Sequence, residues 1–206
     1  TNGGIDTVVT SVAITGGVDL GEGDDTLQVT AANLSFAAEG GAHDNGDTFI
    51  GADEIAYWTV AGDNSGSYRN TTTDIISFTN FENLTGGTGN DTYTLNIGST
   101  LDGVIDGGGH TAQIADPNAP NLNNDTFGDE IVATALIDAN TFIQENIRSG
   151  EGDYSFANVE RLSVRAQLGE GLYDTIQSGN GVNSWVINGS NQGVLINEAT
   201  GATTYF

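Results

Sequence analysis

The feature that most constrains this chain is an internal repetition of its sequence. The pattern F-x-N-φ-E-x-L, where φ is apolar, occupies residues 78–84 and returns at residues 156–162, 78 positions further on. Residues 47–55 resemble residues 125–131 at the same offset. Repetition at a fixed period is typical of a solenoid or an array of stacked units. The sequence therefore predicts a single segment over residues 1–206, with repeats at approximately 45–122 and 123–200 and a partial copy at 1–44.

A short module recurs inside these repeats. Aspartate followed by threonine and an apolar residue stands at positions 6, 25, 47, 91, 125 and 174, each time after a turn rich in Gly or Asn. Such turns are tight, and β-branched and aromatic residues favour strands, so each module predicts a turn that leads into a short strand. A spacing of about twenty residues matches one coil of a parallel β-helix. The predicted fold is all-β, a parallel β-helix or β-solenoid of about ten coils and roughly 50 Å in length, with inserted loops at 61–74 and 115–124.

One copy of the module suggests a metal site. Residues 86–94, GGTGNDTYT, fit the nine-residue pattern G-G-x-G-x-D-x-U-x, in which U is apolar. Glycines permit left-handed turns, which bring backbone carbonyls and the Asp91 carboxylate into one small space. Calcium prefers such oxygen ligands. The alternative is a purely structural turn, in which the aspartate accepts hydrogen bonds from nearby backbone N–H groups.

The charge balance limits the partners of this chain. There are 28 acidic residues and four basic ones, all arginine, so the formal net charge is −24. Nucleic acids and anionic membranes are poor partners for such a surface, because binding a polyanion depends on Lys and Arg. Divalent cations are good partners, since they offset the self-repulsion. No Cys is present, and no apolar run approaches eighteen residues, so we expect any export signal to lie outside this segment.

These stretches carry a resemblance to a known class of repeats. FENLTGGTGNDTYTL, LDGVIDGGG and NGGIDTVV resemble the repeat-in-toxin class and the giant repetitive surface proteins and adhesins of Gram-negative bacteria. The resemblance implies a secreted protein at the bacterial cell surface, with calcium bound between successive turns. Carried over by position, the calcium ligands are Asp91 with Gly87 and Gly89, Asp25 with Gly23, and Asp174 with Gly171. The nonapeptides here stand apart rather than in tandem, which favours isolated, partly hydrated sites.

Other polar residues have simpler interpretations. His43 and His110 follow similar glycine turns, but the third copy has Gln192, so a hydrogen-bonding turn residue explains all three better than a metal ligand. Glu82 and Glu160 are equivalent residues of two copies, about 20 Å apart on the predicted rod. Paired glycosidase carboxylates stand within about 10 Å of each other. These glutamates are therefore interpreted as members of a side-chain ladder or as calcium-side ligands, and no catalytic residue is predicted.

Three functions remain open at this point. The first is a structural segment of a calcium-dependent extracellular protein, either an adhesin stalk or a filament or sheath subunit, which associates head to tail with copies of itself or with adjacent repeats. The second is a module that binds a glycan or a protein partner through the loops at 61–74 and 115–124. The third is a polysaccharide-acting β-helix enzyme, for which no lysine and no catalytic grouping are visible. The first is preferred, so the chain is not expected to be an enzyme.

Overall fold

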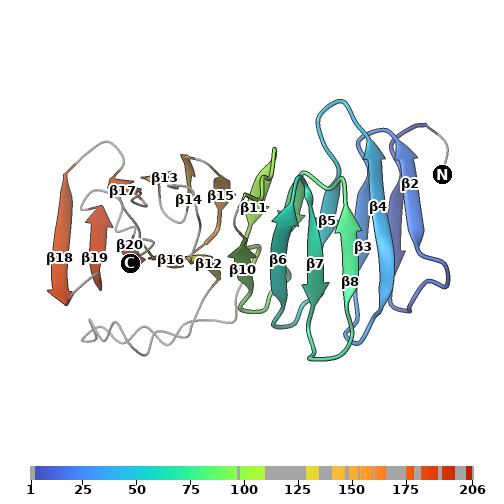
Figure 1. Ribbon diagram of the computed structural model, residues 1–206, viewed down its shortest axis with the longest axis horizontal. Coiled ribbons are helices and arrows are strands. Elements are labelled where there is room, and N and C mark those ends of the chain that lie inside the picture. Colours follow the sequence, from blue (N-terminus) through green and yellow to red (C-terminus); the bar gives the residue numbers. More distant parts are fainter. Residues whose placement is uncertain are drawn as a thin grey trace.

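The computed structural model describes residues 3–96, 98–109, 129–134, 141–146, 149–152, 154–159, 161–165, 175–178, 182–189, 192–197 and 203–205. Within these residues the chain is all-β, as the sequence predicts, with twenty strands and no helix. The described part of the chain therefore contains no helical segment able to cross a membrane. In Figure 1 the strands follow one another along the longest axis, from β2 near the N-terminus to β18 at the opposite end.

The strands form three sheets, none of them closed. The first sheet contains, in spatial order, β1 (Thr7–Thr10), β3 (Thr26–Val29), β5 (Thr48–Ile50), β9 (Asn83–Thr85), β11 (Val104–Asp106), β15 (Ser155–Ala157), β14 (Ser149–Gly152), β13 (Thr141–Asn146) and β17 (Thr175–Ser178). The second sheet contains β16 (Arg161–Arg165), β12 (Glu130–Thr134), β10 (Thr92–Leu95), β6 (Tyr57–Gly62), β7 (Ser65–Arg69), β8 (Ile76–Thr79), β4 (Phe36–Ala42) and β2 (Val18–Glu22). The third sheet consists of the antiparallel strands β18 (Asn183–Gly189), β19 (Gln192–Asn197) and β20 (Thr203–Tyr205), and β20 lies against β16.

The Asp-Thr-apolar module sets the register of the first sheet. Strands β1, β3, β5 and β9 are parallel, and their first residues, Thr7, Thr26, Thr48 and Asn83, lie directly beside one another. The residues that follow are Val8, Leu27, Phe49 and Leu84, of which the last three are fully buried. Side chains alternate between the faces of a strand, so the apolar residue after each Thr points into the core while the Thr faces outward.

The core has an aromatic centre. Phe49, Trp58, Tyr68, Phe78, Phe81 and Tyr93 are all at most 2% exposed. Phe49 contacts Trp58 edge to face, with ring centroids 4.9 Å apart, and Trp58 stacks on Tyr93 at 5.6 Å. These rings come from both sheets, so the cluster joins the two layers. Offset and edge-to-face pairs of this kind add roughly 0.5–1.5 kcal/mol each beyond their buried area.

Half of the predicted loop at 61–74 lies in strands. Strands β6 and β7 form an antiparallel hairpin that turns at Asp63 and Asn64, and β7 then pairs antiparallel with β8. Residues 70–74, and the two turn residues, are the part of the predicted loop that lies outside the strands. Strand β7 was not predicted because Tyr68 is its one apolar residue, so the sequence lacks the apolar–polar alternation that is typical of a strand. The second predicted loop, 115–124, lies outside the described residues.

The repeated F-x-N-φ-E-x-L pattern forms a corner between sheets. Asn80 follows β8, Asn158 follows β15, and each has a left-handed backbone with φ of 52°. After Asn80 the chain crosses from the second sheet to the first, whereas after Asn158 it crosses from the first to the second. An antiparallel trio precedes each corner, β6–β7–β8 and β13–β14–β15. The corner therefore recurs with the two sheets exchanged, while the limits of the repeats remain a prediction.

Not every part of the repeat alignment is structurally equivalent. Ile55 precedes β6 and is 55% exposed, whereas Ile131 is fully buried within β12. Residues 53–55 and 129–131 are thus not counterparts. Residues 125–128 lie outside the described part of the chain, so the other half of that alignment is not tested.

Candidate functional site

Acidic side chains directly before four neighbouring strands of the first sheet, β1, β3, β5 and β9, form a hydrogen-bonded row. The backbone N–H of Asp6 donates to Asp25 Oδ1 at 2.6 Å, and that of Asp25 donates to Asp47 Oδ1 at 2.7 Å. The N–H of Asp47 donates in turn to Glu82 Oε2 at 2.7 Å. Asp25, Asp47 and Glu82 are at most 3% exposed. We call Asp6, Asp25, Asp47 and Glu82 the first carboxylate ladder.

The second sheet has a matching row. The N–H of Ala56, directly before β6, donates to Asp91 Oδ1 at 2.8 Å, and the N–H of Asp91 donates to Asp129 Oδ1 at 2.7 Å. Asp91 Oδ2 also accepts the N–H of Gly87 at 3.1 Å. Asp91 and Asp129 are fully buried. We call Ala56, Asp91 and Asp129 the second carboxylate ladder.

The ladders arise from the way a parallel strand begins. The N–H of the residue before each strand has no backbone acceptor on its neighbour, and a buried N–H left unpaired costs roughly 1–3 kcal/mol. The carboxylate of the next strand supplies the acceptor. The backbone carbonyl of the residue before a strand also accepts a hydrogen bond, from the first N–H of the neighbouring strand. The N–H groups of Thr26, Thr48 and Glu130 donate in this way to the carbonyls of Asp6, Asp25 and Asp91, at 2.8–2.9 Å. Asp25, Asp47 and Asp91 therefore each join their own strand to the neighbours on both sides.

The nearby glycines are required by close packing. A Cβ on Gly40 would lie 1.9 Å from the Asn80 carbonyl oxygen and 2.7 Å from Asp47 Oδ2. A Cβ on Gly86 would lie 2.2 Å from Asp91 Oδ2. The glycines predicted to be calcium ligands face similar limits, because a Cβ on Gly23, Gly87 or Gly89 would lie 2.0–2.3 Å from backbone atoms of another segment. The glycine-rich turns thus let the backbone approach the carboxylates of the ladders.

Burial raises the pKa of two ladder carboxyl groups, those of Asp47 and Asp91. Desolvation raises the pKa of Asp91 to about 7, against the opposing effect of its two N–H donors. Desolvation also raises the pKa of Asp47, and the neighbouring charges of Glu82 and Asp25 act in the same direction. Asp25 Oδ2 and Asp47 Oδ2 are buried without a hydrogen-bond partner among the described residues. Burial therefore shifts both groups toward the neutral form, because nothing nearby fully replaces the lost hydration.

A histidine side chain contacts Glu82, the last member of the first carboxylate ladder. His43 Nε2 lies 3.1 Å from Glu82 Oε1, and the histidine side chain is 30% exposed while that of Glu82 is 3% exposed. A protonated His43 would therefore offset part of the buried negative charge. Glu82 is a ladder member, which was one of its two sequence interpretations. Its counterpart Glu160 lies outside the described residues, as does His110.

The Asp91 carboxylate bridges two backbone N–H groups in the described part of the chain. Both oxygens of Asp91 already accept N–H groups, and calcium needs six to eight oxygen ligands. No group of three or more His, Asp or Glu side chains in the described part of the chain is arranged to hold a metal ion. Calcium binding at Asp91 and Asp25 therefore stays a prediction. Asp174 and Gly171, also predicted to bind calcium, lie outside the described residues.

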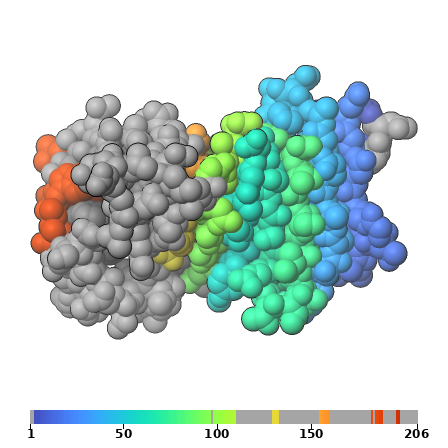
Figure 2. Space-filling view, in the orientation of Figure 1, coloured from blue at the N-terminus to red at the C-terminus, as the bar shows by residue number. Residues whose placement is uncertain are grey.

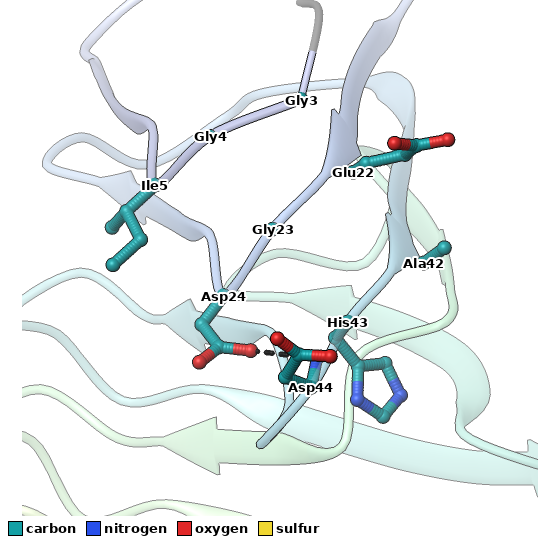
Figure 3. A pocket seen from close by; sticks show the side chains of 9 residues that line it. All are labelled: Gly3, Gly4, Ile5, Glu22, Gly23, Asp24, Ala42, His43 and Asp44. Carbon is teal, nitrogen blue, oxygen red and sulfur yellow. Dashed lines mark hydrogen bonds between the residues drawn. The ribbon is translucent and has the colours of Figure 1, made fainter.

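An open hollow lies beside the N-terminal strands (Figure 3). Gly3, Gly4, Ile5, Glu22, Gly23, Asp24, Ala42, His43 and Asp44 line it, and its volume is about 520 Å³. Asp24 Oδ1 accepts the N–H groups of Asp44 and Asn45 at 2.9 and 2.8 Å, and Oδ2 accepts Asn45 Nδ2 at 2.6 Å. These bonds, chiefly from Asn45, lower the pKa of Asp24 to about 2. Asp24 therefore stays ionised, and its hydrogen bonds link its own turn to the turn at residues 44 and 45.

Sequence reasoning identified part of the ladders. It singled out Asp6, Asp25, Asp47 and Asp91 through the Asp-Thr-apolar module and Glu82 through the repeat, but it did not connect them to one another. It missed Asp129, which precedes Glu130 and Ile131 instead of Thr. The signal that unites them is an acidic residue directly before a strand that has a parallel neighbour.

Comparison with protein-family models, with curated proteins and with solved structures finds no significant match for this chain. The fold and the site therefore define its class by themselves: an all-β protein whose neighbouring strands are joined by buried carboxylate ladders.

Proposed function

We propose that this chain is a structural β-solenoid segment of an extracellular bacterial surface protein. The observation that carries the proposal is the pair of carboxylate ladders, which repeat one contact from strand to strand along the stack. Their buried atoms serve the connection between coils and are closed to substrates. The F-x-N-φ-E-x-L corners support the solenoid, because they carry the chain from one sheet to the other.

The cell-surface location and the use of calcium rest on the sequence resemblance and on the net charge of −24. In this proposal the ladders join neighbouring coils, and calcium acts as a counter-ion to the exposed carboxylates. Because the ladder oxygens are buried, calcium raises the stability of the segment without replacing any ladder contact.

Paired cysteines test the coil geometry directly, because the chain has no native Cys. Thr26 and Thr48 are in-register neighbours on parallel strands, so we expect Thr26→Cys with Thr48→Cys to form a disulfide on mild oxidation. The matched control is Thr7→Cys with Thr48→Cys, which lie two strands apart, about 10 Å, and are too distant to bridge. Equal cross-linking of both pairs, or of neither, would refute the in-register coil.

A calcium titration tests whether calcium acts as a counter-ion to the exposed carboxylates. The melting temperature is measured in chelator and in millimolar calcium, for the unaltered chain and for Asp91→Ala. We expect calcium to raise both melting temperatures by the same amount, with Asp91→Ala lower throughout. A calcium effect that disappears in Asp91→Ala would instead place the ion at Asp91, and identical curves with and without calcium would remove calcium from the proposal.

A further inference from the structure

Four sequons, tripeptides of the form Asn-x-Ser/Thr, lie wholly in the described part of the chain. They begin at Asn33, Asn70, Asn83 and Asn90. A sequon is the acceptor for N-linked sugars and serves as one where it lies in a surface loop. A glycosyltransferase has to surround the asparagine amide and the hydroxyl of the third residue. The fold therefore decides which of the four sequons a transferase can reach on the folded chain.

Three of these sequons have a buried middle residue. Leu34 is 7% exposed, and Leu84 and Asp91 are fully buried. Both ends of the Asn83 amide are also held: Oδ1 accepts the first N–H of β11 at 3.1 Å, and Nδ2 donates at 3.4 Å to the backbone carbonyl of the residue before β5. A transferase cannot lift these three sequons from the surface unless part of the core opens. The folded chain thus shields the sequons at Asn33, Asn83 and Asn90.

The sequon Asn70-Thr71-Thr72 is arranged differently. It lies in the turn at residues 70–75 between β7 and β8, at the lower rim of the stack in Figure 1. This part of the chain forms the green surface at the same rim in Figure 2. Asn70 and Thr71 are half-buried, Thr72 is exposed, and none of the three belongs to a strand. A transferase can therefore reach this sequon without parting two strands.

The Asn70 amide has a single weak contact. Its Nδ2 lies 3.4 Å from the Tyr68 hydroxyl oxygen, which is long for a hydrogen bond. That hydroxyl also accepts the N–H of Ala52 at 2.9 Å, so Tyr68 keeps a partner when the Asn70 amide turns away. No hydrogen bond of the Thr72 hydroxyl is found among the described residues. The two groups that a transferase recognises are thus both available in this turn.

We propose that Asn70 is an attachment site for a sugar that is transferred from a nucleotide-diphosphate donor. Asn70 Nδ2 attacks the anomeric carbon of the sugar. The new N–C bond forms, the bond between that carbon and the diphosphate oxygen breaks, and Nδ2 gives up one proton as the diphosphate leaves. A soluble donor is preferred to one anchored in an anionic membrane, because the net charge of −24 opposes approach to such a membrane. The site does not depend on the structural role proposed above.

A sugar at Asn70 is compatible with the fold. The turn at residues 70–75 contains no member of either carboxylate ladder, and the attached sugar extends from it into solvent. Exposed turns of this kind tolerate added groups better than strands do. We therefore expect the modified chain to melt at the same temperature as the unmodified chain.

The test compares the folded chain with unfolded acceptors. A transferase specific for Asn-x-Ser/Thr is supplied with uridine diphosphate glucose, and it is chosen so that it modifies synthetic peptides spanning all four sequons. After the same treatment of the folded chain, mass spectrometry should locate hexose at Asn70. Modification at the other three sequons should be about ten-fold lower or less, because access there requires local unfolding. Absence of hexose at Asn70, or equal modification of any of the other three, overturns the proposal.

Two threonine variants separate the sequon from the exposure of the turn. Thr72→Ala removes the third residue of the sequon and keeps Asn70, so we expect the hexose to be lost. The matched control is Thr73→Ala, which removes an exposed hydroxyl one position further along the chain and should keep the hexose. Melting curves show that both variants are folded. Loss of the hexose in both variants, or in neither, would contradict recognition of this sequon.

Discussion

Replacement of Asp91 by Asn isolates the energetics of a ladder carboxyl group. Asp91 is fully buried, and its oxygens accept the N–H groups of Ala56 and Gly87. Asn has nearly the same shape and keeps one acceptor oxygen, but it cannot ionise. The variant therefore resembles the protonated state of Asp91 at every pH.

The magnitude follows from the raised pKa. Burial raises the pKa of Asp91 to about 7 in the folded chain, whereas an unfolded chain loses that proton near pH 4. Between these values unfolding releases a proton, so the stability that this group contributes is complete below pH 4, falls as the pH rises, and is lost above pH 7. Three pH units at 1.36 kcal/mol each correspond to about 4 kcal/mol.

The assay is urea denaturation at a series of pH values from 4 to 8. Unfolding free energies of the unaltered chain include the self-repulsion of all 28 acidic residues, so the informative quantity is the difference from Asp91→Asn. We expect the unaltered chain to lose about 4 kcal/mol more than the variant across this range.

The control is Asp24→Asn. Hydrogen bonds from Asn45 and Asp44 lower the pKa of Asp24 to about 2, so its stabilising contribution is lost only as the pH falls below about 4. This variant should keep the slope of the unaltered chain between pH 4 and 8. If Asp91→Asn also keeps that slope, Asp91 ionises freely in the folded protein and the argument from burial is wrong.

The other predictions concern the packing around the ladders. Gly40→Ala should destabilise the chain by about 3 kcal/mol or more, because its Cβ would lie 1.9 Å from the Asn80 carbonyl oxygen. Gly109→Ala, with nothing nearer than 3.5 Å, should change stability by no more than about 0.5 kcal/mol, and equal losses in urea would refute the packing argument. Phe49→Ala should cost about 3–5 kcal/mol because it opens the aromatic centre, and a melting temperature equal to that of Thr48→Ala would contradict that role.

The sequence alone determined the strand module and its faces. In Asp47-Thr48-Phe49 the turn residues before Asp47 end the preceding element, and the strand places Thr48 outward and Phe49 inward. These are local effects, since turn conformation and period-2 alternation depend on neighbouring residues of the chain. For that reason the all-β class and most of the ladder residues were predictable.

Only the tertiary structure decided what the aspartates bind. The donors to the Oδ1 atoms of Asp25, Asp47 and Asp91 come from residues 19, 22 and 35 positions away. The chain between them does not specify which strand lies beside which. Strand β7 became a strand for the same reason, because β6 and β8 provide its hydrogen bonds. Glycine next to aspartate is common to a calcium turn and to a carboxylate ladder. The two differ in which backbone groups lie against the carboxylate, and packing between distant segments sets that arrangement.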